Sequence, residues 1–198
     1  GVEANPLAAF AAAVKVDWRP DPDGLLAHAD RIAQTAAREL ARDGLADAPG
    51  AAPALLPASL RQLAPEVLRL LPMGAISPLP LHKTLVLTDA IGRLRDGRYQ
   101  QHERLALATA LAGPVGNLRF APEVSVGPAK RDAAVIAPWR VGVATMASDL
   151  RALRSRDQPT ITVHPTDARG LDRVLEPRSI DAVITSPPYP NEKDYSRT

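Results

Sequence analysis

The chain contains no cysteine among its 198 residues. This absence excludes disulfide bonds, thiolate zinc sites and catalysis by a cysteine nucleophile. No apolar run approaches the roughly 20 residues that a membrane-spanning helix needs, and the N-terminus lacks the basic-then-apolar order of a signal peptide. The four histidines include no pair at metal-ligand spacing. We therefore expect a cytoplasmic protein that binds neither a membrane nor a metal ion.

The composition that remains is that of a folded domain. Hydrophobic residues make up 45% of the chain, which is enough to bury a core. The 20 prolines and 12 glycines are separated by long stretches of periodic hydrophobicity, so they are expected to mark turns and loops between elements. A net charge of +2 permits a nucleic-acid partner without requiring one.

Hydrophobic periodicity predicts helices through most of the chain. Asn5 and Pro6 supply an N-cap and a first-turn proline for a helix that runs to about Lys15. An amphipathic helix starts near Gly24 and carries one apolar stripe as far as Leu40. Further helices are expected over residues 60–71, 81–95, 100–112 and 138–154, with a flexible connection over 47–57 and an extended loop over 115–137.

The two ends of the chain differ from this helical middle. Residues 1–4 are expected to end a strand, and two further strands are expected over 160–163 and 180–185, with a brief helix over 171–175 between them. Strand, helix and strand in this order predict a βαβ unit of a parallel sheet. The predicted domains are thus a core formed by residues 1–20 and 158–198, split by a helical insertion over 21–157.

The segment after the last predicted strand contains residues suited to binding a substrate. Ser186, Pro187, Pro188 and Tyr189 follow a buried strand at its carboxyl end, where open α/β sheets bind ligands. A base amine is a poor nucleophile, and the Ser186 hydroxyl and the Pro187 carbonyl can accept hydrogen bonds from it. Successive prolines leave no N–H groups that compete for these acceptors. Tyr189 offers a face for an extruded base. The alternative is a proline-rich turn after a core strand.

The run from Asp181 to Tyr189 resembles motif IV of the S-adenosylmethionine-dependent amino-methyltransferases that make N4-methylcytosine or N6-methyladenine in DNA. The residues after it also resemble the corresponding stretch of bacterial DNA methylases. The resemblance implies a partial class I, Rossmann-like α/β fold with a large α-helical insertion. It makes Ser186, Pro187, Pro188 and Tyr189 the catalytic residues. Serine in the first position favours cytosine N4 over adenine N6.

Two acidic residues resemble the cofactor motifs of the same family. Glu3 ends the first predicted strand, and the resemblance assigns it to the ribose of S-adenosylmethionine, with Asn5 starting the next helix. Asp167 and Ala168 follow the second predicted strand and resemble the motif that contacts the cofactor's adenine. A capped helix after a strand explains Glu3 and Asn5 equally well. His164 is interpreted as a local hydrogen-bonding residue.

The family's glycine-rich first motif is not found, and the chain opens on Gly1 without an initiator methionine. We therefore expect an internal fragment of an enzyme that is inactive by itself. Direct attack of the amine on the sulfonium methyl group needs no covalent intermediate, so the absence of cysteine is compatible with this chemistry.

Several alternatives stay open. Residues 92–131 hold seven Arg or Lys against three acids, which fits a solvated helix face as well as a DNA-contacting surface. The substrate could be RNA or a protein amide instead of DNA. The chain could also be a non-catalytic DNA-binding module, or a helical scaffold with a chance Ser-Pro-Pro-Tyr turn. A restriction nuclease is a candidate partner.

Overall fold

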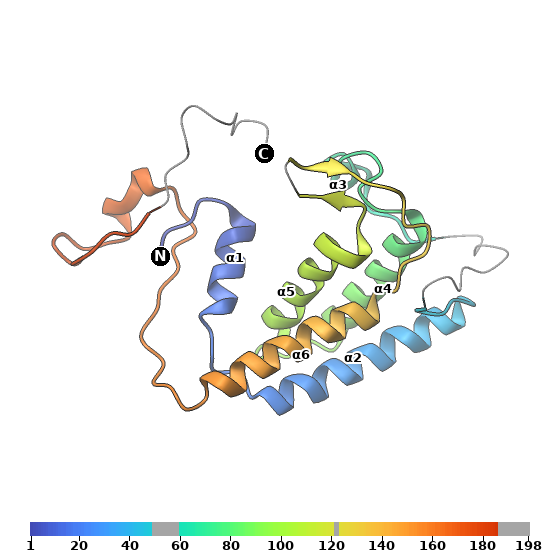
Figure 1. Cartoon of the computed structure of the whole chain (residues 1–198), viewed down its shortest axis with the longest axis horizontal. Coiled ribbons are helices and arrows are strands. Elements are labelled where there is room, and N and C mark those ends of the chain that lie inside the picture. Colours follow the sequence, from blue (N-terminus) through green and yellow to red (C-terminus); the bar gives the residue numbers. More distant parts are fainter. Residues whose placement is uncertain (49–59, 121–122, 186–198) are drawn as a thin grey trace. The chain divides into compact units, whose positions relative to one another are not determined.

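The computed structural model describes residues 1–48, 60–120 and 123–185, and these divide into two compact units (Figure 1). Unit 1 comprises Gly1–Val16 and Thr160–Thr198, and unit 2 comprises Asp17–Pro159. The helices are α1 (Pro6–Lys15), α2 (Pro22–Arg42), α3 (Pro65–Leu68), α4 (Pro78–Arg93), α5 (Gln100–Ala110), the π-helical turn η1 (Leu111–Val115), α6 (Ile136–Leu153) and the 3-10 helix η2 (Ala168–Arg173). The strands are β1 (Leu118–Arg119) and β2 (Ser125–Val126).

The predicted Rossmann-like α/β fold is wrong. The protein is about 53% helical, and within the described ranges the one sheet is the antiparallel pair β1–β2. Of the three predicted strands, those over 1–4 and 160–163 are reduced to one isolated parallel bridge between Val2 and His164. The strand predicted over 180–185 does not form.

The reason lies in what a strand requires. β-branched residues favour extended backbone, but a strand exists only when its N–H and C=O groups pair with a neighbouring segment. Residues 180–185 find no such neighbour in the part of the chain that the structure describes. Val183 and Ile184 are consequently 81% and 98% exposed. The apolar run over residues 180–185 predicts a buried strand, but in the structure it faces solvent.

Unit 2 is built on two long helices, α2 and α6, which pack along one another (Figure 1). Helix α6 also packs against α5, and α2 also packs against α4. The amphipathic helix predicted from Gly24 is confirmed, with Leu25, Ile32 and Leu40 fully buried on its inner face. Trp139 of α6 is also completely buried and lies in the hydrophobic core that these helices share.

The stretch predicted as an extended loop over 115–137 contains the β1–β2 hairpin. Leu118 pairs with Val126 and Arg119 with Ser125. Asn117 fixes the base of the hairpin, because its backbone N–H donates to the Ala75 carbonyl at 2.7 Å and its side-chain amide donates to Gly74 and Ser77. The hairpin is thereby attached to the segment that leads into α4.

Unit 1 contains α1, η2 and the bridge between its two chain segments. The predicted cap of α1 is confirmed: Asn5 Oδ1 accepts from the backbone N–H groups of Leu7 and Ala8 at 2.9 and 3.1 Å. The described residues of unit 1 bury few apolar side chains, of which Ala9 and Val14 are the most enclosed. The helix predicted over 171–175 starts earlier, as η2.

Candidate functional site

The candidate site lies where the two segments of unit 1 pair. The backbone N–H of Glu3 donates to the His164 carbonyl at 3.1 Å, and that of His164 donates to the Gly1 carbonyl at 2.9 Å. The Gly1 ammonium donates to the Thr162 carbonyl at 2.7 Å. These bonds join residues about 160 positions apart in parallel orientation, so both segments run in one direction toward Glu3 and Asp167.

Glu3 is half-buried and its carboxylate faces the start of α1. Its Oε1 accepts from the Asn5 backbone N–H at 2.8 Å. Its Oε2 accepts no hydrogen bond within the described residues. Glu3 therefore combines a local structural role with one acceptor oxygen that is available to another donor. Asn5, the other residue assigned to the cofactor in this motif, uses its side chain to cap α1.

Asp167 is exposed and caps η2. Its Oδ1 accepts from the Arg169 backbone N–H at 2.9 Å, and the Arg169 guanidinium donates to both carboxylate oxygens, at 3.0 and 2.6 Å. The hydrogen bonds from Arg169 lower the pKa of Asp167 to about 2, so the carboxylate is ionised at neutral pH. Ala168 is the exposed first residue of η2 and presents no polar side chain.

The predicted target-binding residues Ser186, Pro187, Pro188 and Tyr189 lie outside the described residues. The structure pairs residues 1–3 with residues 162–164, so Glu3 lies within the pairing and Asp167 lies three residues beyond it. A carboxylate can accept hydrogen bonds from the hydroxyl or amino groups of a nucleoside. His164, interpreted as a local hydrogen-bonding residue, takes part in the pairing through its backbone.

Buried polar groups in unit 2 were missed by the sequence reasoning. His28 of α2 and Glu103 of α5 form a pair in the core, with side chains 4% and 0% exposed and a distance of 2.5 Å between His28 Nδ1 and Glu103 Oε1. His28 Nε2 lies 2.6 Å from the Leu94 carbonyl. Burial raises the pKa of Glu103, and the hydrogen bond with His28 opposes this effect.

A second buried pair joins α4 to the segment before α6. Lys83 Nζ donates to Asp132 Oδ1 at 2.6 Å, with side chains 1% and 5% exposed. The start of α6 is capped by a residue distant in sequence. The Asp47 carboxylate accepts hydrogen bonds from the backbone N–H groups of Val135, Ile136 and Ala137. Both arrangements stabilise helix positions.

His82 of α4 is buried and holds the segment that precedes α3. Its Nδ1 accepts from the Arg61 backbone N–H at 3.0 Å, while its Nε2 lies 3.3 Å from Asp43 Oδ2. Burial lowers the pKa of His82, although the charge of Asp43 opposes this shift. The neutral ring is the form that this contact with Arg61 requires.

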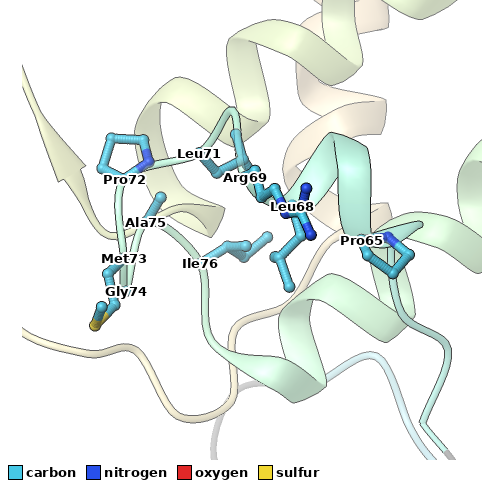
Figure 2. Close-up of a pocket in the computed structure, with 9 residues that line it drawn as sticks. All are labelled: Pro65, Leu68, Arg69, Leu71, Pro72, Met73, Gly74, Ala75 and Ile76. Atoms are coloured by element: carbon cyan, nitrogen blue, oxygen red, sulfur yellow. The ribbon is translucent and has the colours of Figure 1, made fainter.

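Open grooves lie on the described part of unit 2, among them two larger ones. One, of about 470 Å³, is lined by Asp17, Arg19, Pro20, Asp21, Gly97, Arg98 and Tyr99. Its charges are balanced locally, because Arg19 pairs with Asp17 and Arg98 with Asp96. The other, of about 510 Å³, is mainly aliphatic and is lined by Pro65, Leu68, Arg69, Leu71, Pro72, Met73, Gly74, Ala75 and Ile76 (Figure 2).

Among residues 1–48, 60–120 and 123–185, no group of three or more His, Asp or Glu side chains is placed to hold a metal ion. No helix in these ranges is both long and apolar enough to cross a membrane. Comparison of the chain with protein-family models, with curated proteins and with solved structures found no match.

Proposed function

We propose that the chain forms part of an S-adenosylmethionine-dependent methyltransferase that acts on an exocyclic amine of a DNA base, cytosine N4 in preference to adenine N6. The observation that carries the proposal is the pairing of residues 1–3 with residues 162–164. It supports a shared cofactor site, because Glu3 and Asp167 are the acidic residues that the two segments lead into. The Ser-Pro-Pro-Tyr sequence at 186–189 adds the expected target-binding groups.

Each residue has a definite task in this proposal. The free Oε2 of Glu3 would accept from a ribose hydroxyl, and Asp167 would accept from the adenine amino group. S-adenosylmethionine supplies the methyl group as a sulfonium electrophile. Ser186 Oγ and the Pro187 carbonyl would hold the target NH2 and stabilise the positive charge that develops on nitrogen. Tyr189 would stack on the flipped base.

The carboxylates fit this ligand to different degrees. Glu3 keeps an acceptor oxygen open while it holds Asn5. Asp167 already accepts from Arg169 with both oxygens, but each carboxylate oxygen can accept two hydrogen bonds. The proposal does not rest on a parallel sheet, which the described residues lack. A cytoplasmic location and a restriction nuclease as partner belong to the same proposal.

Cofactor binding is the first test. Titration calorimetry with S-adenosylmethionine on the complete gene product should detect binding. Glu3→Gln and Asp167→Asn should each weaken it about tenfold, because each removes a charge-assisted hydrogen bond. Asp172→Asn is the matched control, since Asp172 is an exposed acid on the same 3-10 helix with no assigned role. Equal effects of all three substitutions would refute the assignment.

The acceptor is the second test. Methyl-labelled cofactor should transfer its label to duplex DNA, and Ser186→Ala or Tyr189→Ala should abolish transfer without loss of helical content measured by circular dichroism. Transfer of the labelled methyl group only to structured RNA, or only to protein, would refute DNA as the acceptor. Full activity of both variants would refute the role of the 186–189 segment.

A non-catalytic DNA-binding module is the second candidate function. It is favoured by the local engagement of the Asp167 carboxylate, both of whose oxygens are already bound by Arg169. Tight binding of duplex DNA together with no heat of S-adenosylmethionine binding would establish this alternative.

A further inference from the structure

An apolar surface with no partner in the described structure lies on unit 2, around α3 and the β1–β2 hairpin. Its most exposed members are Met73 at 97% and Leu70 at 81%. We call this surface the hairpin patch. Its exposed apolar residues are Val67, Leu68, Leu70, Leu71, Met73, Phe120, Val124 and Val126. Isolated monomers rarely expose so many large apolar side chains in one region, and such patches mark interaction sites.

The patch is continuous across its two segments. Val126 Cγ1 of β2 lies 3.4 Å from the position that a side chain on Gly74 would occupy. Asn117 at the base of the hairpin donates to the Gly74 carbonyl at 2.9 Å. The aliphatic groove in Figure 2 runs between α3 and Gly74, so the patch includes a concave part as well as projecting side chains.

The charged residues in these segments are balanced in sign. Glu66 and Arg69 flank Val67 and Leu68 of α3, and Arg119 and Glu123 lie on either side of Phe120 in the sequence of the hairpin region. All four are exposed, and none forms an ion pair within the described residues. Over residues 65–76 and 118–126, two acids and two arginines give a formal charge of zero. This set of charges does not favour a polyanion such as nucleic acid, or an anionic membrane.

We propose that the hairpin patch is the contact between two copies of this chain, related by a two-fold axis. A two-fold axis brings the same patch onto itself, so each glutamate can meet an arginine of the other copy. The free edges of a two-stranded ribbon offer backbone groups for pairing as well. Leu70 and Met73 of one copy are the projecting side chains that the groove of the other can bury.

Sedimentation equilibrium of the full chain over a wide concentration range tests the proposal. The wild type should sediment with twice the mass of one chain. Met73→Glu should raise the dissociation constant at least about tenfold, because association would bury an unpaired carboxylate. Since Met73 is 97% exposed in one chain, the substitution leaves the fold of unit 2 intact.

Two matched controls locate the contact. Val141→Glu alters a 67% exposed residue of α6 outside the patch, and Ile184→Glu alters a 98% exposed residue of unit 1. Both variants should keep the wild-type dissociation constant. Loss of the dimer on Ile184→Glu, with Met73→Glu unaffected, would place the contact in unit 1 and overturn the proposal.

Charge exchange tests the symmetry independently of the apolar residues. One variant carries Glu66→Arg with Glu123→Arg, and the other carries Arg69→Glu with Arg119→Glu. Each should be monomeric alone, because the four like charges of one copy would face the same four on the other, and an equimolar mixture should form a dimer. A monomeric wild type, or a mixture that stays monomeric while the wild type is a dimer, would refute the two-fold contact through this patch.

Discussion

Glu103 joins three helices of unit 2 through polar contacts inside the core. Its carboxylate contacts His28 of α2, and its backbone carbonyl accepts from Trp139 Nε1 of α6 at 2.9 Å. Because the Leu94 carbonyl can only accept, His28 Nε2 donates to it. The 2.5 Å contact on the other side of the ring therefore needs one more proton, held by either His28 or Glu103. Glu103 Oε2 has no hydrogen-bond partner among the described residues.

Substitution of Glu103 should separate the role of the hydrogen bond from that of the charge. Glu103→Ala should lower the free energy of unfolding by about 3 kcal/mol, because it leaves His28 buried without its partner. Glu103→Gln should cost less than about 1 kcal/mol, since an amide N–H can donate to the neutral ring at Nδ1. Urea denaturation followed by circular dichroism measures both values. Equal losses for the two variants would show that the carboxylate charge itself is required.

The packing of α5 against α6 depends on a close approach at Gly142. A Cβ atom at this position would lie 3.3 Å from the Cβ of Ala106, which is tighter than ordinary contact. Both residues face the interface between the two helices. Small side chains therefore set the distance between α5 and α6.

Gly142→Val should consequently reduce the free energy of unfolding by about 1–3 kcal/mol, as overpacking of a filled core does. Gly92→Ala in α4 is the matched control. Apart from the backbone of α4 itself, no described atom lies within 4 Å of a Cβ at Gly92, so the higher helix propensity of alanine should raise stability by up to about 1 kcal/mol. Thermal unfolding of both variants checks the opposite signs. A stable Gly142→Val variant would mean that α5 and α6 separate at little cost.

Elements defined by local interactions could be predicted from the sequence. The cap at Asn5 and the apolar stripe of α2 depend on residues within a few positions of one another, and both are present. The β1–β2 hairpin was missed because each strand has two residues, too few for an alternating pattern. The strand predicted over 180–185 was wrong because strand formation depends on a distant partner, which local residue preferences do not specify.

The same distinction applies to the candidate site. Glu3 and Asp167 are candidate site residues because each comes after a predicted strand and resembles a cofactor motif, whereas the register that pairs Val2 with His164 is a contact between two distant segments of the chain. No local pattern encodes it. The burial of His28 could have been recognised, since it lies three residues after Leu25 and four before Ile32 on the apolar stripe. Its partner Glu103 could not, because their approach depends on how α2 and α5 pack.

At the scale of the whole molecule, the two units differ in how much apolar surface they bury. The described residues of unit 2 enclose a core that includes Trp139 and Ile32. In unit 1, Leu7 is 62% exposed and Ile184 is 98% exposed. Unit 1 therefore gains little hydrophobic stabilisation from the part of its fold that the structure describes.

Amide hydrogen exchange should reveal this difference. Amides of α6 should exchange at least about 100-fold more slowly than those of α1, because regions with few buried apolar contacts open at low free energy. Mass spectrometry after peptic digestion gives the protection of each helix. Addition of S-adenosylmethionine to the complete gene product should raise protection in α1 selectively. Equal protection of α1 and α6 without ligand would contradict the difference in stability between the units.

The ends of unit 2 are tied to each other by ion pairs. Arg154 Nη2 lies 3.1 Å from Asp21 Oδ1, and Arg151 Nη2 lies 2.5 Å from Asp23 Oδ1. The polypeptide thus enters and leaves this helical bundle at nearly one point. Because its two ends lie close together, unit 2 acts as a loop within the chain. The entropic cost of closing a loop rises only slowly with its length. We therefore expect unit 2 to tolerate circular permutation, since a short linker would join its two ends.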